Sequence, residues 1–134
     1  MAIRNIFVNL PVNDLNKSKE FFSKVGFEFN PQFTNEVAAS MVINDNIYAM
    51  LLVEDYFKTF ITKEIVDSSK STEVLLALSA DSKEEIDEIA SKVKAAGGKL
   101  AYEPKENGPM YGTSFEDLDG HIWELIYMDP SAIQ

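Results

Sequence analysis

Among the side chains of this sequence that could carry acid–base chemistry, Glu124 is the most distinctive. It lies in a run of large apolar residues that favours an extended strand, His121-Ile122-Trp123-Glu124-Leu125-Ile126-Tyr127. A carboxylate placed there, on the floor of a cleft, can act as a general acid or base or hold a cationic ligand. The alternative is a carboxylate without a functional role, paired with a basic group or a backbone donor or facing water.

Histidine occurs once, as His121, and follows Asp119-Gly120 at the start of the same strand. Strand alternation places it on the face opposite Glu124. Because the sequence assigns it no carboxylate partner, we favour a histidine that hydrogen-bonds within its own turn over a catalytic one. Cysteine is absent, which excludes thiol nucleophiles and thiolate zinc sites, and one histidine cannot build a metal cage of several imidazoles.

The length and charge of the chain limit the number of domains it can form and the partners it can bind. Its 134 residues, 46% of them hydrophobic and 25% charged, fit one ordinary globular domain. The formal net charge of −10 repels phosphate backbones and anionic lipid, so we expect no nucleic-acid and no membrane partner. The N-terminus carries no secretory h-region, and the longest purely apolar stretch, 49–53, is far shorter than the ~20 residues of a membrane span. We therefore expect a cytoplasmic protein.

Apolar periodicity predicts a strand, a helix and three further strands in the first half of the chain. The helix lies between Asp14, which can cap its first turn, and Gly26, which supplies a left-handed stop. The last two strands flank Asn44-Asp45-Asn46, a composition suited to a hairpin turn with positive φ. The predicted strands cover residues 3–12, 27–33, 37–43 and 47–53.

The same order recurs in the second half. A capping box, Ser82-Lys83-Glu84-Glu85, opens a helix that Gly97-Gly98 ends, and Leu118-Asp119-Gly120 joins the last two strands. The predicted strands cover residues 73–80, 99–102, 111–116 and 121–128. We expect an α+β domain, 1–134, of two βαβββ modules, about 3–53 and 73–128. Residues 54–72 form a linker that packs over a pocket or against a second subunit, and residues 103–109 form a surface loop.

Three stretches resemble the vicinal oxygen chelate superfamily, which holds glyoxalase I, bleomycin-resistance proteins and extradiol dioxygenases. They are Val8-Asn9-Leu10-Pro11-Val12-Asn13-Asp14, Ser18 with Phe21-Phe22 and Gly26-Phe27, and Phe115-Glu116-Asp117-Leu118-Asp119-Gly120-His121-Ile122-Trp123-Glu124-Leu125. The resemblance runs from Ile3 to about Met128 and is nearest to the bacterial lactoylglutathione-lyase-like group. It implies two βαβββ modules that curl around a shared cleft, usually in a homodimer.

Metal-dependent members of that superfamily place one ligand in the first strand and one in the last strand of each module. By resemblance, the first-strand positions here are Phe7 and Leu75, and the last strand of the first module offers Met50 or Leu52. Of the four positions, Glu124 alone keeps a ligand type, and one carboxylate cannot hold a divalent cation tightly. We therefore expect no metal ligands and no cofactor, with a divalent metal as the disfavoured alternative.

The remaining candidates would line an apolar cleft with few polar groups, which suits a small organic ligand. The predicted lining residues are Phe7, Asn9, Tyr48, Met50, Leu52, Leu75, Ala77 and Tyr111. A filled core without a cavity is the alternative.

Two functions follow from this cleft. The first is a glyoxalase-like lyase or isomerase, with Glu124 as the acid/base and Tyr111 or Asn9 orienting a carbonyl-containing substrate. The second is a non-catalytic protein of the antibiotic-resistance type, which sequesters a cationic or aromatic compound. Whether the chain is an enzyme is left open, and a structural or regulatory dimer without a ligand is a third reading.

Overall fold

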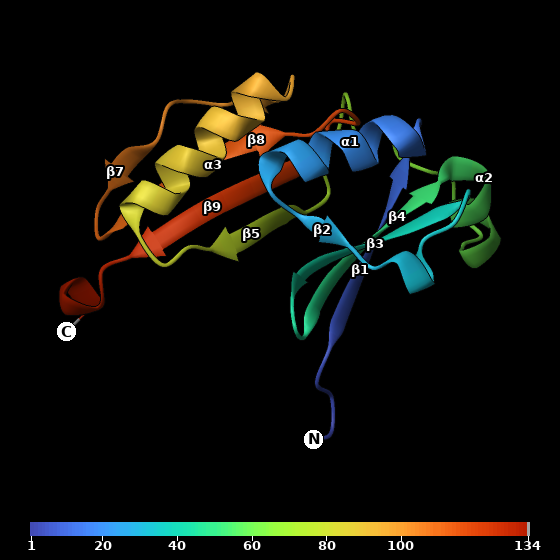
Figure 1. The fold of residues 1–134 in the computed structure, drawn as a ribbon, viewed down its shortest axis with the longest axis horizontal. Coiled ribbons are helices and arrows are strands. Elements are labelled where there is room, and N and C mark those ends of the chain that lie inside the picture. The colour runs from blue at the N-terminus through green and yellow to red at the C-terminus, as the bar shows by residue number, and fades with distance from the viewer. Residues whose placement is uncertain (134) are drawn as a thin grey trace. The chain divides into compact units, whose positions relative to one another are not determined.

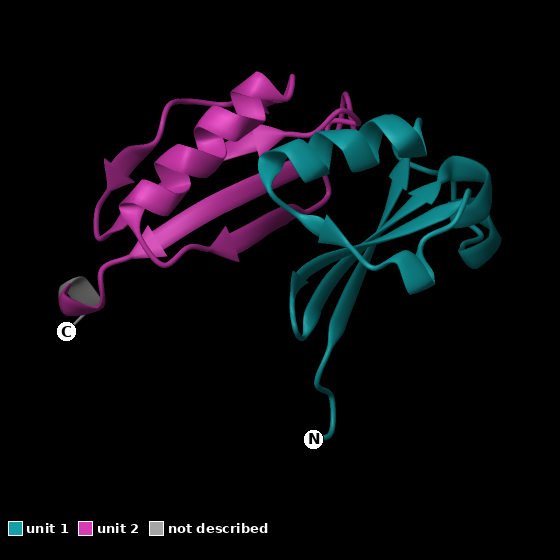
Figure 2. Ribbon diagram, viewed as in Figure 1, with its two compact units in different colours: residues 1–66 teal, residues 67–134 magenta. Residues whose placement is uncertain are grey.

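The computed structural model describes residues 1–133, which form two compact units. The first unit covers residues 1–66 and the second begins at residue 67 (Figure 2). Each unit is a mixed sheet with a helix across one face (Figure 1). The α+β class and the repeated strand–helix–strand order are therefore confirmed, with four strands in the first sheet and five in the second.

The first sheet has the strand order β1-β4-β3-β2, with β1 parallel to β4 and the other pairs antiparallel. Helix α1 packs against β2, β3 and β4. Two 3-10 turns and a short helix complete the unit. In chain order, the elements are β1 (Ile6–Val12), α1 (Leu15–Val25), β2 (Glu28–Phe29), η1 (Pro31–Phe33), β3 (Ala38–Asn44), β4 (Ile47–Val53), α2 (Glu54–Phe57) and η2 (Lys58–Phe60).

The second sheet repeats this plan with the order β5-β9-β8-β6. β6 pairs with the C-terminal part of β8, and β7 pairs with the N-terminal part of the same strand. β5 runs parallel to β9, and α3 packs against β6, β8 and β9. The elements are β5 (Leu75–Ser79), α3 (Lys83–Ala95), β6 (Lys99–Leu100), β7 (Lys105–Asn107), β8 (Met110–Glu116), β9 (Ile122–Met128) and η3 (Pro130–Ile133). Among the described residues, no helix is long and apolar enough to cross a membrane.

Local capping explains where both long helices begin. The Asp14 carboxylate accepts a hydrogen bond from the backbone N–H of Lys17, and the Ser82 hydroxyl accepts one from the N–H of Glu85. The Glu85 carboxylate reaches back to the N–H of Asp81, not of Ser82 as a strict capping box requires. Gly26, with φ 120°, ends α1 as predicted.

Three local predictions are wrong in detail. Residues 27–33 do not form one strand, because Asn30 caps a 3-10 turn that begins at Pro31 and ends the extended chain after Phe29. The turn at 44–46 contains no residue with positive φ, and the register instead shifts between Val42 and Asn44. The loop predicted at 103–109 contains β7, which forms a hairpin with β8 around Gly108 at φ 62°.

Candidate active site

Glu124 lies on the face of the second sheet that α3 leaves open. Its strand neighbours Trp123 and Leu125 are buried on the helix side, 1% and 2% exposed. Alternation therefore turns Glu124 to the other side, together with Ile122 and Ile126. The side chain is half-buried, and the described residues provide its carboxylate with no hydrogen bond or ion pair.

The neighbours of Glu124 across the sheet are small. Ala77 of β5 and Ser114 of β8 are its register partners, so no long side chain covers the carboxylate from either strand. A half-buried carboxylate without a compensating partner loses part of its hydration and gains no hydrogen bond in return. Glu124 is therefore available to a proton, a cation or a polar ligand.

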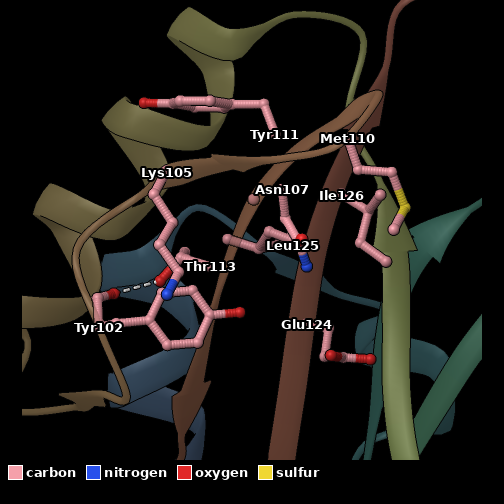
Figure 3. A pocket seen from close by; sticks show the side chains of 10 residues that line it. Tyr102, Lys105, Asn107, Met110, Tyr111, Thr113, Glu124, Leu125 and Ile126 are labelled. Carbon is pink, nitrogen blue, oxygen red and sulfur yellow. Dashed lines mark hydrogen bonds between the residues drawn. The ribbon is translucent and has the colours of Figure 1, made fainter.

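A pocket of about 80 Å³ lies beside Glu124 (Figure 3). Its floor includes Gly112, where a Cβ atom would lie 2.3 Å from the Leu125 carbonyl oxygen, so only glycine lets the two strands approach this closely. The lining residues are Tyr102, Lys105, Asn107, Met110, Tyr111, Gly112, Thr113, Glu124, Leu125 and Ile126. The pocket thus combines one cationic and one anionic side chain with several neutral polar groups.

Lys105 and Tyr102 line the side of this pocket that lies opposite β9. The Lys105 Nζ lies 4.4 Å from the centroid of the Tyr102 ring, a cation–π contact. The Tyr102 carbonyl accepts a 2.5 Å hydrogen bond from the Thr113 hydroxyl, which holds this loop against β8. In Figure 3 the Tyr102 hydroxyl is directed toward the side of the pocket on which Glu124 lies.

Tyr111 lines the same pocket, but its hydroxyl is directed away from Glu124 (Figure 3). It donates a 2.5 Å hydrogen bond to the Asp87 carboxylate on α3. This hydrogen bond, the loss of hydration and the negative charge of Asp87 raise the pKa of Tyr111 to about 12. Tyr111 therefore lines the pocket while its hydroxyl group contacts α3, and its catalytic role stays a prediction.

A second pocket, of about 350 Å³, lies within the first unit. Three of the predicted ligand-binding residues, Asn9, Met50 and Leu52, line it together with residues that were not predicted to bind a ligand. These are Gln32, Phe33, Asn35 and Ala38, and Tyr56 and Phe60 of the segment expected to pack over a pocket or against a second subunit. Tyr56 and Phe60 come from the predicted linker, and their rings meet edge to face with centroids 5.1 Å apart. The pocket is aromatic and carries neutral amides but no charged side chain.

The remaining predicted ligand-binding residues lie elsewhere on the two open sheet faces. Phe7 and Tyr48 are register partners whose rings stack with centroids 5.0 Å apart, and the Tyr48 hydroxyl donates to the Asp45 carbonyl. Leu75 and Ala77 are exposed on β5 beside Glu124. These four residues do not line either pocket, so their role in binding stays a prediction.

The donor types at the inferred metal positions do not fit a divalent cation. Phe7 and Leu75 carry no ligand atom, Met50 and Leu52 offer at most a thioether, and Glu124 alone supplies an oxygen. Among residues 1–133, no group of three or more histidine, cysteine, aspartate or glutamate side chains could hold a metal.

Asp117 is a buried carboxylate that the sequence patterns did not single out. It accepts hydrogen bonds from the N–H groups of Asp119 and His121 and from the Trp123 indole, at 2.9, 3.0 and 3.0 Å. Burial raises the pKa of Asp117, and the charge of His121 and the Trp123 hydrogen bond offset part of that rise. The structure therefore places beside His121 a carboxylate that the sequence did not assign to it, and the placement of His121 in its own hairpin agrees with the favoured structural role.

Many solved structures share this fold, among them three from different organisms. A hypothetical protein from S. aureus is 30% identical, with a TM-score of 0.80 and 95% of each chain covered. A glyoxalase/bleomycin resistance protein/dioxygenase family enzyme from Burkholderia phytofirmans PsJN is 16% identical, with a TM-score of 0.77 and coverage of 92% of this chain and 97% of that chain. The fosfomycin resistance protein FosX from Listeria monocytogenes, complexed with Mn(II) and sulfate, is 21% identical, with a TM-score of 0.70 and coverage of 98% and 95%.

The two structures below 25% identity show a shared fold and not a shared activity. Among curated proteins, no relative of this sequence is found. The model of the Glyoxalase/Bleomycin resistance protein/Dioxygenase superfamily matches residues 6–125, which is most of the chain. The chain therefore belongs to the Glyoxalase/Bleomycin resistance protein/Dioxygenase superfamily.

Proposed function

We propose that this protein is an acid–base enzyme of the lyase or isomerase type, which acts on a small carbonyl compound with Glu124 as the acid/base group. The observation that carries the proposal is the half-buried Glu124 carboxylate, which has no partner among the described residues and belongs to a residue that lines a pocket. Carboxylates in sheets are normally paired or fully hydrated, because the loss of hydration is costly. An unpaired one beside a pocket is suited to proton transfer.

The proposed step is the removal of a proton from the carbon next to a carbonyl group. The C–H bond breaks, the proton passes to the Glu124 carboxylate, and the bonding electrons form an enolate whose negative charge lies on the carbonyl oxygen. Return of the proton to the other face of the same carbon inverts its configuration. Where that carbon bears a hydroxyl group, transfer of the hydroxyl proton to the enolate oxygen and return of the C–H proton to the former carbonyl carbon give an isomer with the carbonyl and hydroxyl groups exchanged. No oxidant, reductant or metal is needed to balance this step.

Proton exchange with solvent tests this proposal directly. Hydroxyacetone, an uncharged carbonyl compound, is incubated with the protein in D₂O, and the loss of its C–H signals is followed by proton NMR. We expect catalysed exchange in the native protein and a fall of 10²-fold or more in Glu124→Gln, which keeps the shape and removes the base. Glu73→Gln is the matched control, because Glu73 is exposed and near the same strand pair. Exchange that is equal in native protein and Glu124→Gln would refute the proposal.

The pocket of the first unit favours a second candidate function, the sequestration of an aromatic or cationic compound without turnover. Its volume of about 350 Å³ is that of a small-molecule site, and Phe33, Tyr56 and Phe60 offer ring faces to a planar cation. The net charge of −10 favours the approach of cations. The planar cation proflavine should bind with an affinity that falls about tenfold in Phe60→Ala. Equal affinity in the variant would count against this pocket.

We also propose a homodimer. Ile6 and Phe7, on the edge strand β1, are 55% and 54% exposed, and exposed apolar residues on an edge strand favour pairing with another surface. Native mass spectrometry should record a dimer, and a monomer at micromolar concentration would refute this part.

A further inference from the structure

The pocket beside Glu124 holds an ammonium group that forms no ion pair. Lys105 is exposed and contacts the Tyr102 ring, but no carboxylate oxygen of the described residues lies within salt-bridge distance of it. Four other lysines do form such pairs, Lys24, Lys83, Lys92 and Lys94, and the remaining six do not. What distinguishes Lys105 is therefore its place in the lining of a pocket that also contains a carboxylate.

Strand pairing explains why Lys105 faces this pocket. Lys105 is the register partner of Gly112, whose missing side chain leaves the pocket open, while its neighbour Glu106 points to the other side and pairs with Lys83 of α3. The alternation along β7 thus sends one charged residue to the helix and the other to the pocket. The cation–π contact with the Tyr102 ring restricts the position of the Lys105 ammonium group.

We propose that Lys105 binds the carboxylate of the substrate, and that the substrate class is therefore a short 2-oxo carboxylate. The inference rests on the proposed function for the role of Glu124. A ligand that satisfies both walls of the pocket needs an anionic end for Lys105 and an acidic C–H for Glu124. The pocket volume of about 80 Å³ admits roughly five to eight non-hydrogen atoms. A 2-oxo carboxylate with three or four carbons meets both requirements.

Tyr102 is assigned a supporting role in the same site. Its hydroxyl is directed across the pocket and is suited to donate a hydrogen bond to the carbonyl oxygen as negative charge develops there. The proton passes from the carbon to the Glu124 carboxylate, and the electron pair of the C–H bond forms the enolate. The Tyr102 hydroxyl donates a hydrogen bond to the negatively charged enolate oxygen. The carboxylate on Lys105 does not change in this step.

The test compares pyruvate with methyl pyruvate, which has the same carbonyl and C–H groups but no negative charge. Binding is measured by titration of the isotopically labelled protein followed by NMR, and exchange is measured in D₂O. We expect the native protein to bind pyruvate more tightly than its ester. In Lys105→Met, the Kd for pyruvate should rise about tenfold while that for the ester stays constant. Lys99→Met, which removes an exposed lysine from the adjacent strand β6, is the matched control.

The outcomes separate this inference from the proposed function. Lys105-dependent binding of pyruvate supports the inference even where no exchange is catalysed, in which case the proposed function fails alone. Glu124-dependent exchange of hydroxyacetone, without any preference for pyruvate over its ester, supports the function and overturns the inference. An equal loss of pyruvate binding in Lys99→Met and Lys105→Met also overturns it, because it points to the general charge of the protein.

Tyr102→Phe should slow exchange and leave the Kd for pyruvate unchanged, and a changed Kd with unchanged exchange would refute its assigned role.

Discussion

Replacement of Glu124 by leucine is expected to stabilise the protein while it abolishes activity. Glu124 is half-buried between Ile122 and Ile126, and its cross-strand partners Ala77 and Ser114 leave room above it. No hydrogen bond or ion pair among the described residues is lost in the variant. A residue kept for function at the expense of stability behaves in this way, whereas a structural residue does not.

The magnitude follows from the burial of the site. Full burial of a leucine side chain contributes about 1.5–3 kcal/mol, and half-burial about half of that. The removal of a partly dehydrated carboxylate acts in the same direction, and solvent screening keeps that contribution small. We therefore expect the free energy of unfolding to rise by about 1 kcal/mol.

Urea unfolding followed by the fluorescence of Trp123, the single tryptophan, measures this change. Circular dichroism provides a second probe, since Trp123 is adjacent to the altered residue. Glu73→Leu, at an exposed position, controls for the general effect of a leucine on the surface. A fall of 1 kcal/mol or more in Glu124→Leu would refute the reasoning, because it would mean that the carboxylate has a stabilising partner.

Two further predictions concern groups near the site. Asp117→Asn should lower the free energy of unfolding by about 2 kcal/mol. The substitution replaces one of the two accepting oxygens by an NH₂ group, so the single remaining oxygen cannot accept from both the backbone N–H groups and the Trp123 indole, and a buried donor is left unsatisfied. Urea unfolding checks this, with the exposed Asp81→Asn as the control, and an unchanged midpoint would contradict it. Tyr111 should titrate near pH 12, and its pKa should fall toward 10.0 in Asp87→Asn, as followed by NMR of labelled tyrosine. Since its folded pKa lies above the unfolded value, its contribution to stability is present below pH 10 and is lost as the pH rises through about 12; an unshifted Tyr111 in the native protein would show that the hydrogen bond to Asp87 is absent in solution.

The sequence by itself determined the order of elements and the orientation of Glu124. Caps such as Asp14 and Ser82 act within a few residues, and strand alternation depends only on the neighbours in the chain, so both can be inferred from local pattern. The residue types at the inferred metal positions, Phe7 and Leu75 among them, are also a property of the sequence alone. Local pattern failed where a turn overrode it, as at Pro31.

Tertiary structure decided which polar groups share a pocket. Lys105 reaches the neighbourhood of Glu124 because β7 pairs with β8 in one register, and no local signal fixes a pairing between strands. The sequence did contain one local signal for the β7–β8 hairpin. This is Gly108, which can adopt the positive φ of a tight turn and directly follows β7. The phenol of Tyr111 was likewise beyond local prediction, because its partner Asp87 lies on a helix 24 residues away in the chain. Caps and alternation are set by neighbours in sequence, whereas a binding site is set by contacts between distant segments, which only the folded chain brings together.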